Sequence, residues 1–328
     1  MKIFVSISAH EAELCIIDQC LNYICVGEFD GVVVHLNAIH EVDISILELL
    51  IDEIEELKGK VHLNPVRLQL HSMRKNPLLT PILHRAHIEN YLYLHKFGAV
   101  DVFCLDASNC LLVKKGLRNY VQGGVGINQE RISKGWPWHK ALARDSVLQQ
   151  SKDFIRVSQH EGTFFDRATF EKICQFILKY DESIAQAFPR AADIPEYTKE
   201  EVLFATAYAA QATGTPPPLK PYVWFRWEKQ LEWPRADVIE ILHHPNLPEG
   251  KYGIKRIPRN INDSSREEIG NYFGYRPILL AACKKIAASG RSSYSLLTPT
   301  GELRNGTTAP DRRSWLKRLG FSKPRFLR

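Results

Sequence analysis

The chain has 328 residues, of which 45% are hydrophobic and 24% are charged, so it can bury a substantial core as one large domain or as two close-packed lobes. No apolar run in the sequence approaches the roughly 18–20 residues that a membrane-spanning helix needs. The seven cysteines include no CxxC pair, which predicts reduced thiols in a cytoplasmic protein and disfavours a metal site.

The positive charge of the chain is concentrated at one end. Residues 311–328 contain seven basic side chains and one acidic one, a net charge of +6 that equals the net charge of the whole chain. The rest of the chain is therefore formally neutral, which disfavours a nucleic-acid-binding surface. The basic tail also contains Trp315 and Phe321, so it fits either an anionic membrane surface or a solubilising chain end.

Residues 1–122 alternate strand-like and helix-like patterns, which predicts an α/β half. β-Branched and apolar runs predict strands over residues 2–8, 31–37, 61–70 and 99–106. Apolar residues at helical spacing predict helices over residues 11–24, 44–57 and 83–97. This alternation is typical of a mostly parallel sheet with helices on both faces.

Polar residues follow three of these predicted strands, namely His10, His35 with Asn37, and Asp106 with Ser108. Ligands of such sheets bind outside the carboxyl ends of the strands, so all five are candidate ligand contacts. The alternative is that each is a turn residue that bonds its own backbone. The sequence has no GxGxxG and no GxxxxGK[ST], which disfavours a dinucleotide oxidoreductase and a P-loop enzyme.

Residues 123–310 form the predicted second half of the same domain, with a C-terminal α+β portion. Residues 160–165 read His-Glu-Gly-Thr-Phe-Phe, in which Gly162 permits a close backbone approach beside Glu161 and Thr163. A helix begins near Thr198, and its first turn carries Glu200 and Glu201. The spacing from Thr198 to Glu201 also fits a capping box, in which Glu201 would only cap the helix.

A second dense basic cluster, outside the tail, spans residues 251–259. Its four cations could neutralise a diphosphate through charge-assisted hydrogen bonds, or they could form a solvated basic face. Arg226, in a strand predicted over residues 222–227, is a further candidate cation. The members of the cluster are Lys251, Lys255, Arg256 and Arg259.

The order of several short stretches is similar to that of a known enzyme family. Residues 198–206, Thr-Lys-Glu-Glu-Val-Leu-Phe-Ala-Thr, resemble a Ser-Pro-Asp-Glu-x-x-aromatic-x-Thr stretch of the core-2/I-branching N-acetylglucosaminyltransferase and xylosyltransferase family. The resemblance spans roughly residues 1–270. Further stretches that resemble the family, in the same order, are residues 5–10, 34–37, 61–70, 83–97, 102–113, 162–165 and 250–256.

This resemblance implies a GT-A-like fold, with residues 1–122 as its nucleotide-binding half and residues 123–310 as its catalytic and acceptor half. It also implies an inverting, metal-independent transfer of N-acetylglucosamine or a related sugar. The donor would be a nucleotide sugar, with UDP as the expected nucleotide, and no resident cofactor is expected. A glycan or a lipid-linked glycan would be the acceptor. The chain departs from the family at Asn37, where an aspartate near the uracil is expected, at Lys199, where proline is usual, and in lacking a disulfide framework.

By the same resemblance, Glu201 would be the general base and Lys251 would hold the diphosphate. Glu200 is the nearest competitor for the base, and Glu161 is a third candidate that could instead hold sugar hydroxyls. Because the spacing does not define the register of the basic cluster, Lys255, Arg256 and Arg226 stay open as diphosphate contacts.

Two other readings of the sequence remain open. The first is a metal-dependent sugar transferase or nucleotidyltransferase that uses Asp106 at the end of its strand. The second is a non-enzymatic binding protein that docks through the basic tail, residues 311–328.

Overall fold

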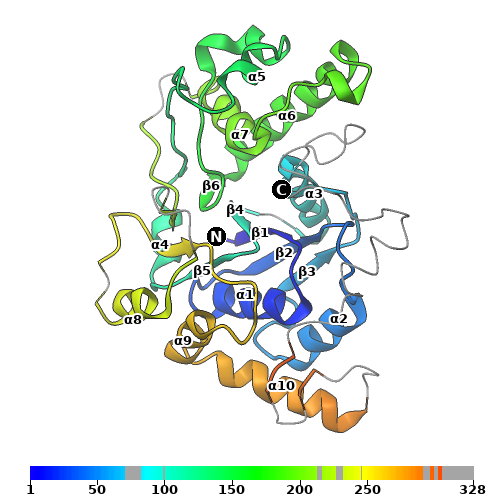
Figure 1. The fold of residues 1–328 in the computed structure, drawn as a ribbon, viewed down its shortest axis with the longest axis vertical. Helices are drawn as coiled ribbons and strands as arrows, with labels where there is room; N and C mark the ends of the chain where they lie inside the picture. The colour runs from blue at the N-terminus through cyan, green and yellow to red at the C-terminus, as the bar shows by residue number, and fades with distance from the viewer. Residues whose placement is uncertain are drawn as a thin grey trace, which may run out of the picture.

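A mostly parallel sheet forms the centre of the computed structural model, which describes residues 1–70, 83–98, 100–212, 216–226, 232–244, 246–290, 296–298 and 302–304 (Figure 1). Its five strands lie in the order β3-β2-β1-β4-β6. The first four are parallel, and β6 runs antiparallel to β4. The strands are β1 (Ile3–Ala9), β2 (Gly31–Leu36), β3 (Val61–Asn64), β4 (Val102–Ala107) and β6 (Thr163–Asp166).

Helices cover both faces of this sheet (Figure 1). Side chains alternate between the two faces of each strand, so Val5 and Ile7 enter one core while Phe103 and Leu105 enter the other. The first core contains α1 (Glu13–Cys25), α2 (Ile44–Glu53), α8 (Arg235–His243), α9 (Ser264–Tyr272) and α10 (Arg276–Ser289). The second contains α3 (Leu83–Leu94), α6 (Arg167–Ala187) and α7 (Lys199–Ala209). The predicted α/β class with a mostly parallel sheet is confirmed.

A smaller sheet joins the late part of the chain to the end of β4. Its order is β5-β8-β7, with β5 (Cys110–Leu112) antiparallel and β7 (Val223–Trp224) parallel to β8 (Gly253–Lys255). The pairing of β8 with β5 carries the basic cluster to the edge of the main sheet. The remaining helices are α4 (Leu117–Val121), α5 (His139–Ala143), η1 (His95–Phe97), η2 (Leu148–Phe154) and η3 (Ala191–Asp193).

The predicted element bounds hold in part. The strand predicted over residues 61–70 ends at Asn64, since Pro65 cannot donate to a strand ladder. The predicted capping box of α7 is wrong, because the Thr198 side chain caps no backbone N–H. Its hydroxyl instead donates to the Glu201 carboxylate at 3.0 Å. In the described ranges no helix is long and apolar enough to cross a membrane, and the basic tail lies outside those ranges.

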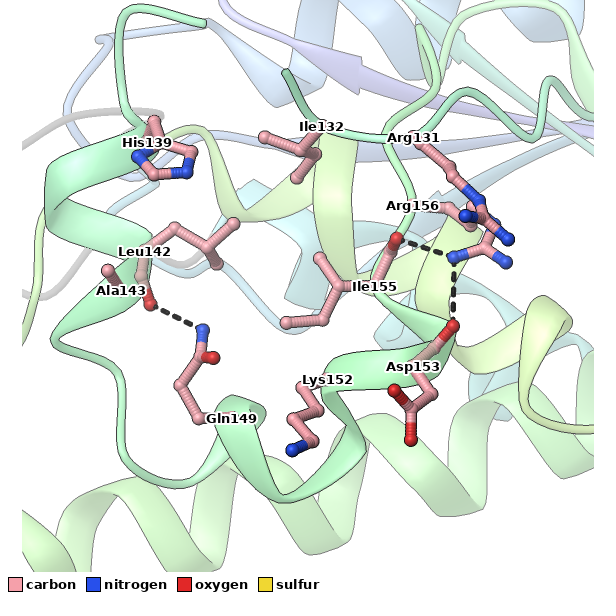
Figure 2. A pocket seen from close by; sticks show the side chains of 10 residues that line it. All are labelled: Arg131, Ile132, His139, Leu142, Ala143, Gln149, Lys152, Asp153, Ile155 and Arg156. Carbon is pink, nitrogen blue, oxygen red and sulfur yellow. Dashed lines mark hydrogen bonds between the residues drawn. The ribbon is translucent and has the colours of Figure 1, made fainter. Parts of the chain in front are cut away.

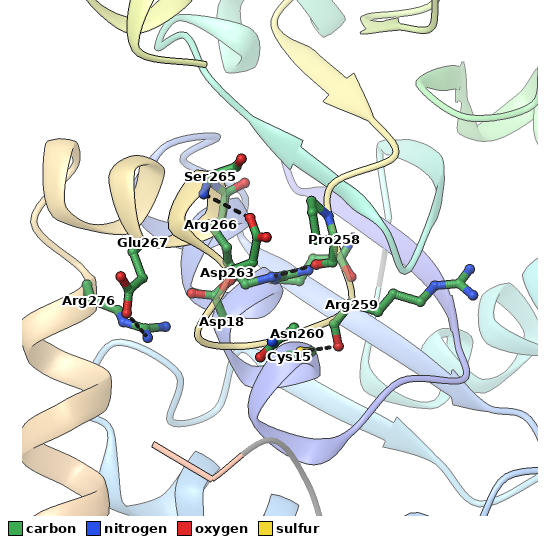
Figure 3. Close-up of polar contacts among 12 residues, drawn as sticks. Cys15, Asp18, Pro258, Arg259, Asn260, Asp263, Ser265, Arg266, Glu267 and Arg276 are labelled. Carbon is green, nitrogen blue, oxygen red and sulfur yellow. Dashed lines mark hydrogen bonds and ion pairs between the residues drawn. The ribbon is translucent and has the colours of Figure 1, made fainter. Parts of the chain in front are cut away.

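A buried ion pair holds α9 against α1 (Figure 3). Arg266 Nη1 lies 2.5 Å from Asp18 Oδ2, and neither side chain is exposed to solvent. Arg266 Nε also donates to the Pro258 carbonyl at 3.2 Å. Charges this deeply buried must stay paired, so the contact determines where the chain after β8 crosses α1.

We expect Asp18→Ala to lower the free energy of unfolding by about 3–5 kcal/mol, because it leaves the Arg266 guanidinium buried without its counterion. Denaturant unfolding measures this loss. The matched control is Glu268→Gln, which breaks the exposed pair with Arg235 and should cost less than about 1 kcal/mol. Similar losses of unfolding free energy in the two variants would show that the buried Asp18–Arg266 pair stabilises the fold no more than an exposed pair does.

Candidate functional site

A pocket of about 350 Å³ lies at the carboxyl ends of β1 and β4. These neighbouring strands are parallel and pair Ser8 with Ala107, so the residues that follow them emerge at one edge of the sheet. Acidic and basic side chains from later in the chain complete the pocket. Its lining residues are Ser8, His10, Leu83, Ala107, Asn109, His160, Glu161, Thr198, Glu200, Glu201, Lys255 and Arg259.

Gly162 directs the chain past the pocket. Its φ of +77° is the left-handed region that favours glycine. A Cβ here would lie 2.4 Å from the backbone nitrogen of Val223, so only glycine fits between β4 and β7. The Gly162 N–H donates to the Leu105 carbonyl at 2.9 Å. Gly162 therefore acts through the backbone to place Glu161, while Thr163 is buried and its hydroxyl donates to the Gln159 carbonyl at 3.1 Å.

A buried lysine anchors the first turn of α7, which carries the two adjacent carboxyls of the pocket. Lys199 is 1% exposed, and its ammonium donates to the Tyr180 hydroxyl at 2.6 Å. The Tyr180 and Tyr197 hydroxyls both donate to the Asp145 carboxylate, at 2.6 and 2.7 Å. Lys199 Nζ also lies 3.9 Å from Asp145. This closed network holds the helix start in place, so the next two residues, Glu200 and Glu201, face the pocket.

Glu161 and Lys255 form an ion pair on the floor of the pocket. Burial by itself would raise the pKa of Glu161, but His160 and Lys255 outweigh burial and lower this pKa to about 2. Burial lowers the pKa of His160, whose Nε2 lies 3.5 Å from Glu161, so the imidazole is neutral at pH 7. Lys255 is therefore the cation that keeps Glu161 ionised.

Glu200 and Glu201 have different environments despite being adjacent. Glu200 is 4% exposed, and its Oε2 has no hydrogen-bond partner among the described residues. Burial raises the pKa of Glu200 to about 8, so it is mostly protonated at pH 7. Burial and the charge of Glu161 also raise the pKa of Glu201, which is less buried and accepts from Thr198. The pocket thus holds a neutral carboxyl beside one that titrates above the usual glutamate range.

The opposite wall of the pocket carries Arg259. Its side chain points away from the Asp18–Arg266 pair (Figure 3), and its Nε lies 2.7 Å from the Glu11 carboxylate. His10 Nε2 lies 3.5 Å from the same carboxylate, and His10 Nδ1 is 3.2 Å from the Ser108 hydroxyl. His10 thus lines the pocket and contacts Ser108 on its other side.

Three predicted strand-end contacts lie elsewhere. Asp106 is fully buried and accepts hydrogen bonds from the Tyr23 and Tyr222 hydroxyls, so a ligand cannot reach it. His35 Nε2 accepts from the Leu68 N–H at 3.1 Å. The Asn37 side chain bonds both the N–H and the carbonyl of Leu70. His35 and Asn37 therefore organise the chain after β3.

Three of the predicted cations also point elsewhere. Lys251 donates to the carbonyls of Pro221 and Val223, at 2.6 and 2.9 Å. Arg226 pairs with Asp237 at 2.6 Å and stacks on Trp233. Arg256 lies over the Phe225 ring, 4.8 Å from its centroid. Lys255 and Arg259 are the cluster members that reach the pocket.

His160 and Arg259 were not singled out from the sequence. His160 precedes Glu161 in the glycine-containing stretch, and Arg259 belongs to the basic cluster, so each had a weak local signal. The sequence does not show where the chain runs after β8. The buried Asp18–Arg266 pair determines this path. In the part of the chain that the structure describes, no group of three or more His, Cys, Asp or Glu side chains is arranged so that it could hold a metal ion.

No family model and no curated protein matches this chain. The functional interpretation therefore depends on the pocket itself. It lies at the sheet edge and contains two carboxyls on one helix turn, together with two cations, Lys255 at the end of β8 and Arg259 shortly after it.

Because the pKa of Glu200 is raised in the folded state, the free energy of unfolding of the protein should fall as pH rises. Its folded pKa of about 8 exceeds the ordinary value of 4.5, so the folded state keeps a proton that the unfolded chain releases between these pH values. Between these two pKa values, the free energy of unfolding of Glu200→Gln should rise by about 1.4 kcal/mol per pH unit relative to that of wild type. Denaturant unfolding from pH 5 to 9 measures the difference. The exposed control Glu130→Gln should track wild type, and a flat difference for Glu200→Gln would refute the raised pKa.

Proposed function

We propose that this protein is an inverting glycosyltransferase that moves a sugar from a nucleotide-sugar donor to a glycan-type acceptor without a metal. The observation that carries the proposal is the pocket at the carboxyl ends of β1 and β4, where two carboxyls of α7 share one space with Lys255 and Arg259. Ligands of parallel α/β sheets bind at this edge. The strand arrangement also supports a GT-A-like fold, which is part of the proposal.

Glu201 is the base in this proposal. An acceptor hydroxyl needs a carboxylate within about 2.6–3.2 Å to take its proton as it attacks the anomeric carbon. A base works best when its pKa lies near the working pH, and burial moves the pKa of Glu201 in that direction. Glu200 suits a different role, because a carboxyl with a pKa of about 8 is protonated at pH 7 and donates a hydrogen bond.

Lys255 and Arg259 are the proposed contacts of the leaving diphosphate. Negative charge develops on this group as the sugar departs, and fixed cations stabilise it. Lys251 is less suited than the resemblance implied, because two backbone carbonyls already accept from its ammonium. His10 and Asn109 line the strand-end side of the pocket, and Glu161, which stays ionised, can accept from sugar hydroxyls.

The cellular setting belongs to the same proposal. We infer a cytoplasmic enzyme with UDP as the expected donor nucleotide and N-acetylglucosamine or a related sugar as the transferred group. The acceptor would be a glycan or a lipid-linked glycan. Association with an anionic membrane through residues 311–328 would bring the enzyme to a lipid-linked acceptor.

Sugar hydrolysis is a second candidate function, favoured by one observation. The pKa values of Glu200 and Glu161 are pushed apart, to about 8 and about 2, and glycosidases use such a pair as proton donor and ionised carboxylate. The two activities differ in the group that receives the sugar. Release of free sugar that added acceptors leave unchanged would favour hydrolysis.

We expect Glu201→Gln to lower the transfer rate by about 100-fold or more, because the amide cannot take the acceptor proton. Wild-type activity should fall as pH drops through the raised pKa of Glu201, at a higher pH than an ordinary glutamate would give. Glu200→Gln keeps a hydrogen-bond donor, so its transfer rate should fall less than that of Glu201→Gln. Initial rates against pH, on variants that unfold like wild type, measure both effects. A folded Glu201→Gln enzyme with near-normal rate would exclude Glu201 as the base.

Donor binding can be tested without knowing the acceptor. A nucleotide sugar at 100 times its dissociation constant should stabilise the fold by about 2.7 kcal/mol, and EDTA should not remove this effect. Lys255→Gln should weaken the thermal shift, whereas Lys114→Gln, an exposed change outside the pocket, should not. A panel with no stabilising nucleotide sugar, or a shift lost in EDTA, would count against the proposal.

A further inference from the structure

A second pocket, of about 400 Å³, lies between α5, η2 and the chain at residues 131–132 (Figure 2). Its volume lies in the range of small-ligand sites. Ile132, Leu142 and Ile155 surround its interior, and Arg131 and Arg156 approach from one side (Figure 2). It shares no lining residue with the candidate functional site. The rest of its lining is His139, Ala143, Gln149, Lys152 and Asp153.

Two arginines lie opposite each other at the edge of this pocket. Glu130 and Val157 form an antiparallel bridge, with backbone hydrogen bonds of 2.9 and 3.3 Å. The next residue on one side is Arg131, and the preceding residue on the other is Arg156, so they form the adjacent cross-strand pair. Like charges in this arrangement destabilise the pairing. Within the described ranges, neither arginine forms an ion pair with a carboxylate.

Arg156 is held in place without a counterion. Its Nη1 donates to the carbonyls of Asp153 and Ile155, at 3.1 and 2.8 Å. Its backbone N–H donates to the Thr206 hydroxyl at 3.2 Å, which ties this edge of the pocket to α7. Because neutral carbonyls hold this guanidinium, no negative charge offsets its positive charge. The side chain is also already in place, so less conformational freedom is lost when an anion binds.

We propose that this pocket binds a phosphate monoester that carries an apolar group. The Arg131–Arg156 pair matches the oxygens of a phosphate, whose charge would also relieve the repulsion between the two guanidiniums. Lys152 adds a third positive charge, against a single carboxylate, Asp153. The apolar part of the ligand packs against the isoleucines and Leu142. This chemistry is shared by soluble alkyl phosphates and by phosphatidic acid, and the assignment does not depend on glycosyl transfer.

Calorimetry with hexyl phosphate, inorganic phosphate and hexanol tests the proposal on the full chain. Hexyl phosphate should bind roughly tenfold or more tightly than either fragment, because it supplies both the charge and the apolar surface. Arg131→Gln and Arg156→Gln should each weaken its binding by roughly tenfold or more. The matched control is Arg144→Gln, an exposed arginine next to the pocket that does not line it, and it should bind as wild type does.

Unfolding without ligand separates binding from folding. Arg131→Gln removes a like-charge contact, so its melting temperature should equal or exceed that of wild type. Added hexyl phosphate should then raise the melting temperature of wild type by more than that of the variant at the same ligand concentration. Unchanged binding in both glutamine variants, or an equal loss in Arg144→Gln, would overturn the assignment.

Vesicles distinguish the two sources of the phosphate. Sedimentation with phosphatidic acid vesicles, but not with phosphatidylcholine vesicles, that requires Arg131 and Arg156 would identify a lipid headgroup. Binding of hexyl phosphate without vesicle binding that requires these two arginines would identify a soluble ligand. Failure of both probes would refute the site.

Discussion

The parallel pairing of β1 with its two neighbours is the constraint on which the rest of the structure depends. It aligns the ends of β1 and β4, so that His10 and Asn109 meet at one edge of the sheet. Segments far along the chain must then reach that edge to complete a pocket. β6 does so by pairing with β4, and β8 does so by pairing with β5. The candidate site is therefore assembled by sheet pairing, and its chemistry comes from the residues that this pairing delivers.

Buried charge is the second organising feature. Asp18 with Arg266 and Lys199 with the Asp145 network lie where water cannot solvate them, and Glu161 is buried beside the partly exposed Lys255. A charge in such a place is stable only with a partner, so each pair or network restricts how its elements can pack. Glu200 lies in the same environment without a cation of its own and is neutral instead. The presence or absence of a neighbouring cation thus leaves one buried glutamate, Glu161, ionised and another, Glu200, protonated.

The two pockets use positive charge in different ways. In the candidate functional site, Lys255 and Arg259 already have carboxylate partners, so an incoming diphosphate would share them. In the second pocket, no described carboxylate pairs with Arg131 or Arg156, and neutral carbonyls hold Arg156 in place. Both pockets contact the α7 region, the first at the start of the helix and the second through Thr206.

The sequence by itself determined the class of the fold and indicated the sheet edge where the candidate pocket lies, because alternating strand and helix patterns are local and the carboxyl ends of parallel strands share one edge. It also singled out Glu161, Glu200, Glu201 and Lys255, which the structure brings to one pocket. Only the tertiary structure decided that Lys255 enters the pocket while Lys251 bonds backbone carbonyls, since this depends on the register of β8. Tertiary contacts also buried Asp106 under two tyrosines and placed Arg131 opposite Arg156. Burial and strand pairing arise between residues distant in the chain, so no local pattern encodes them.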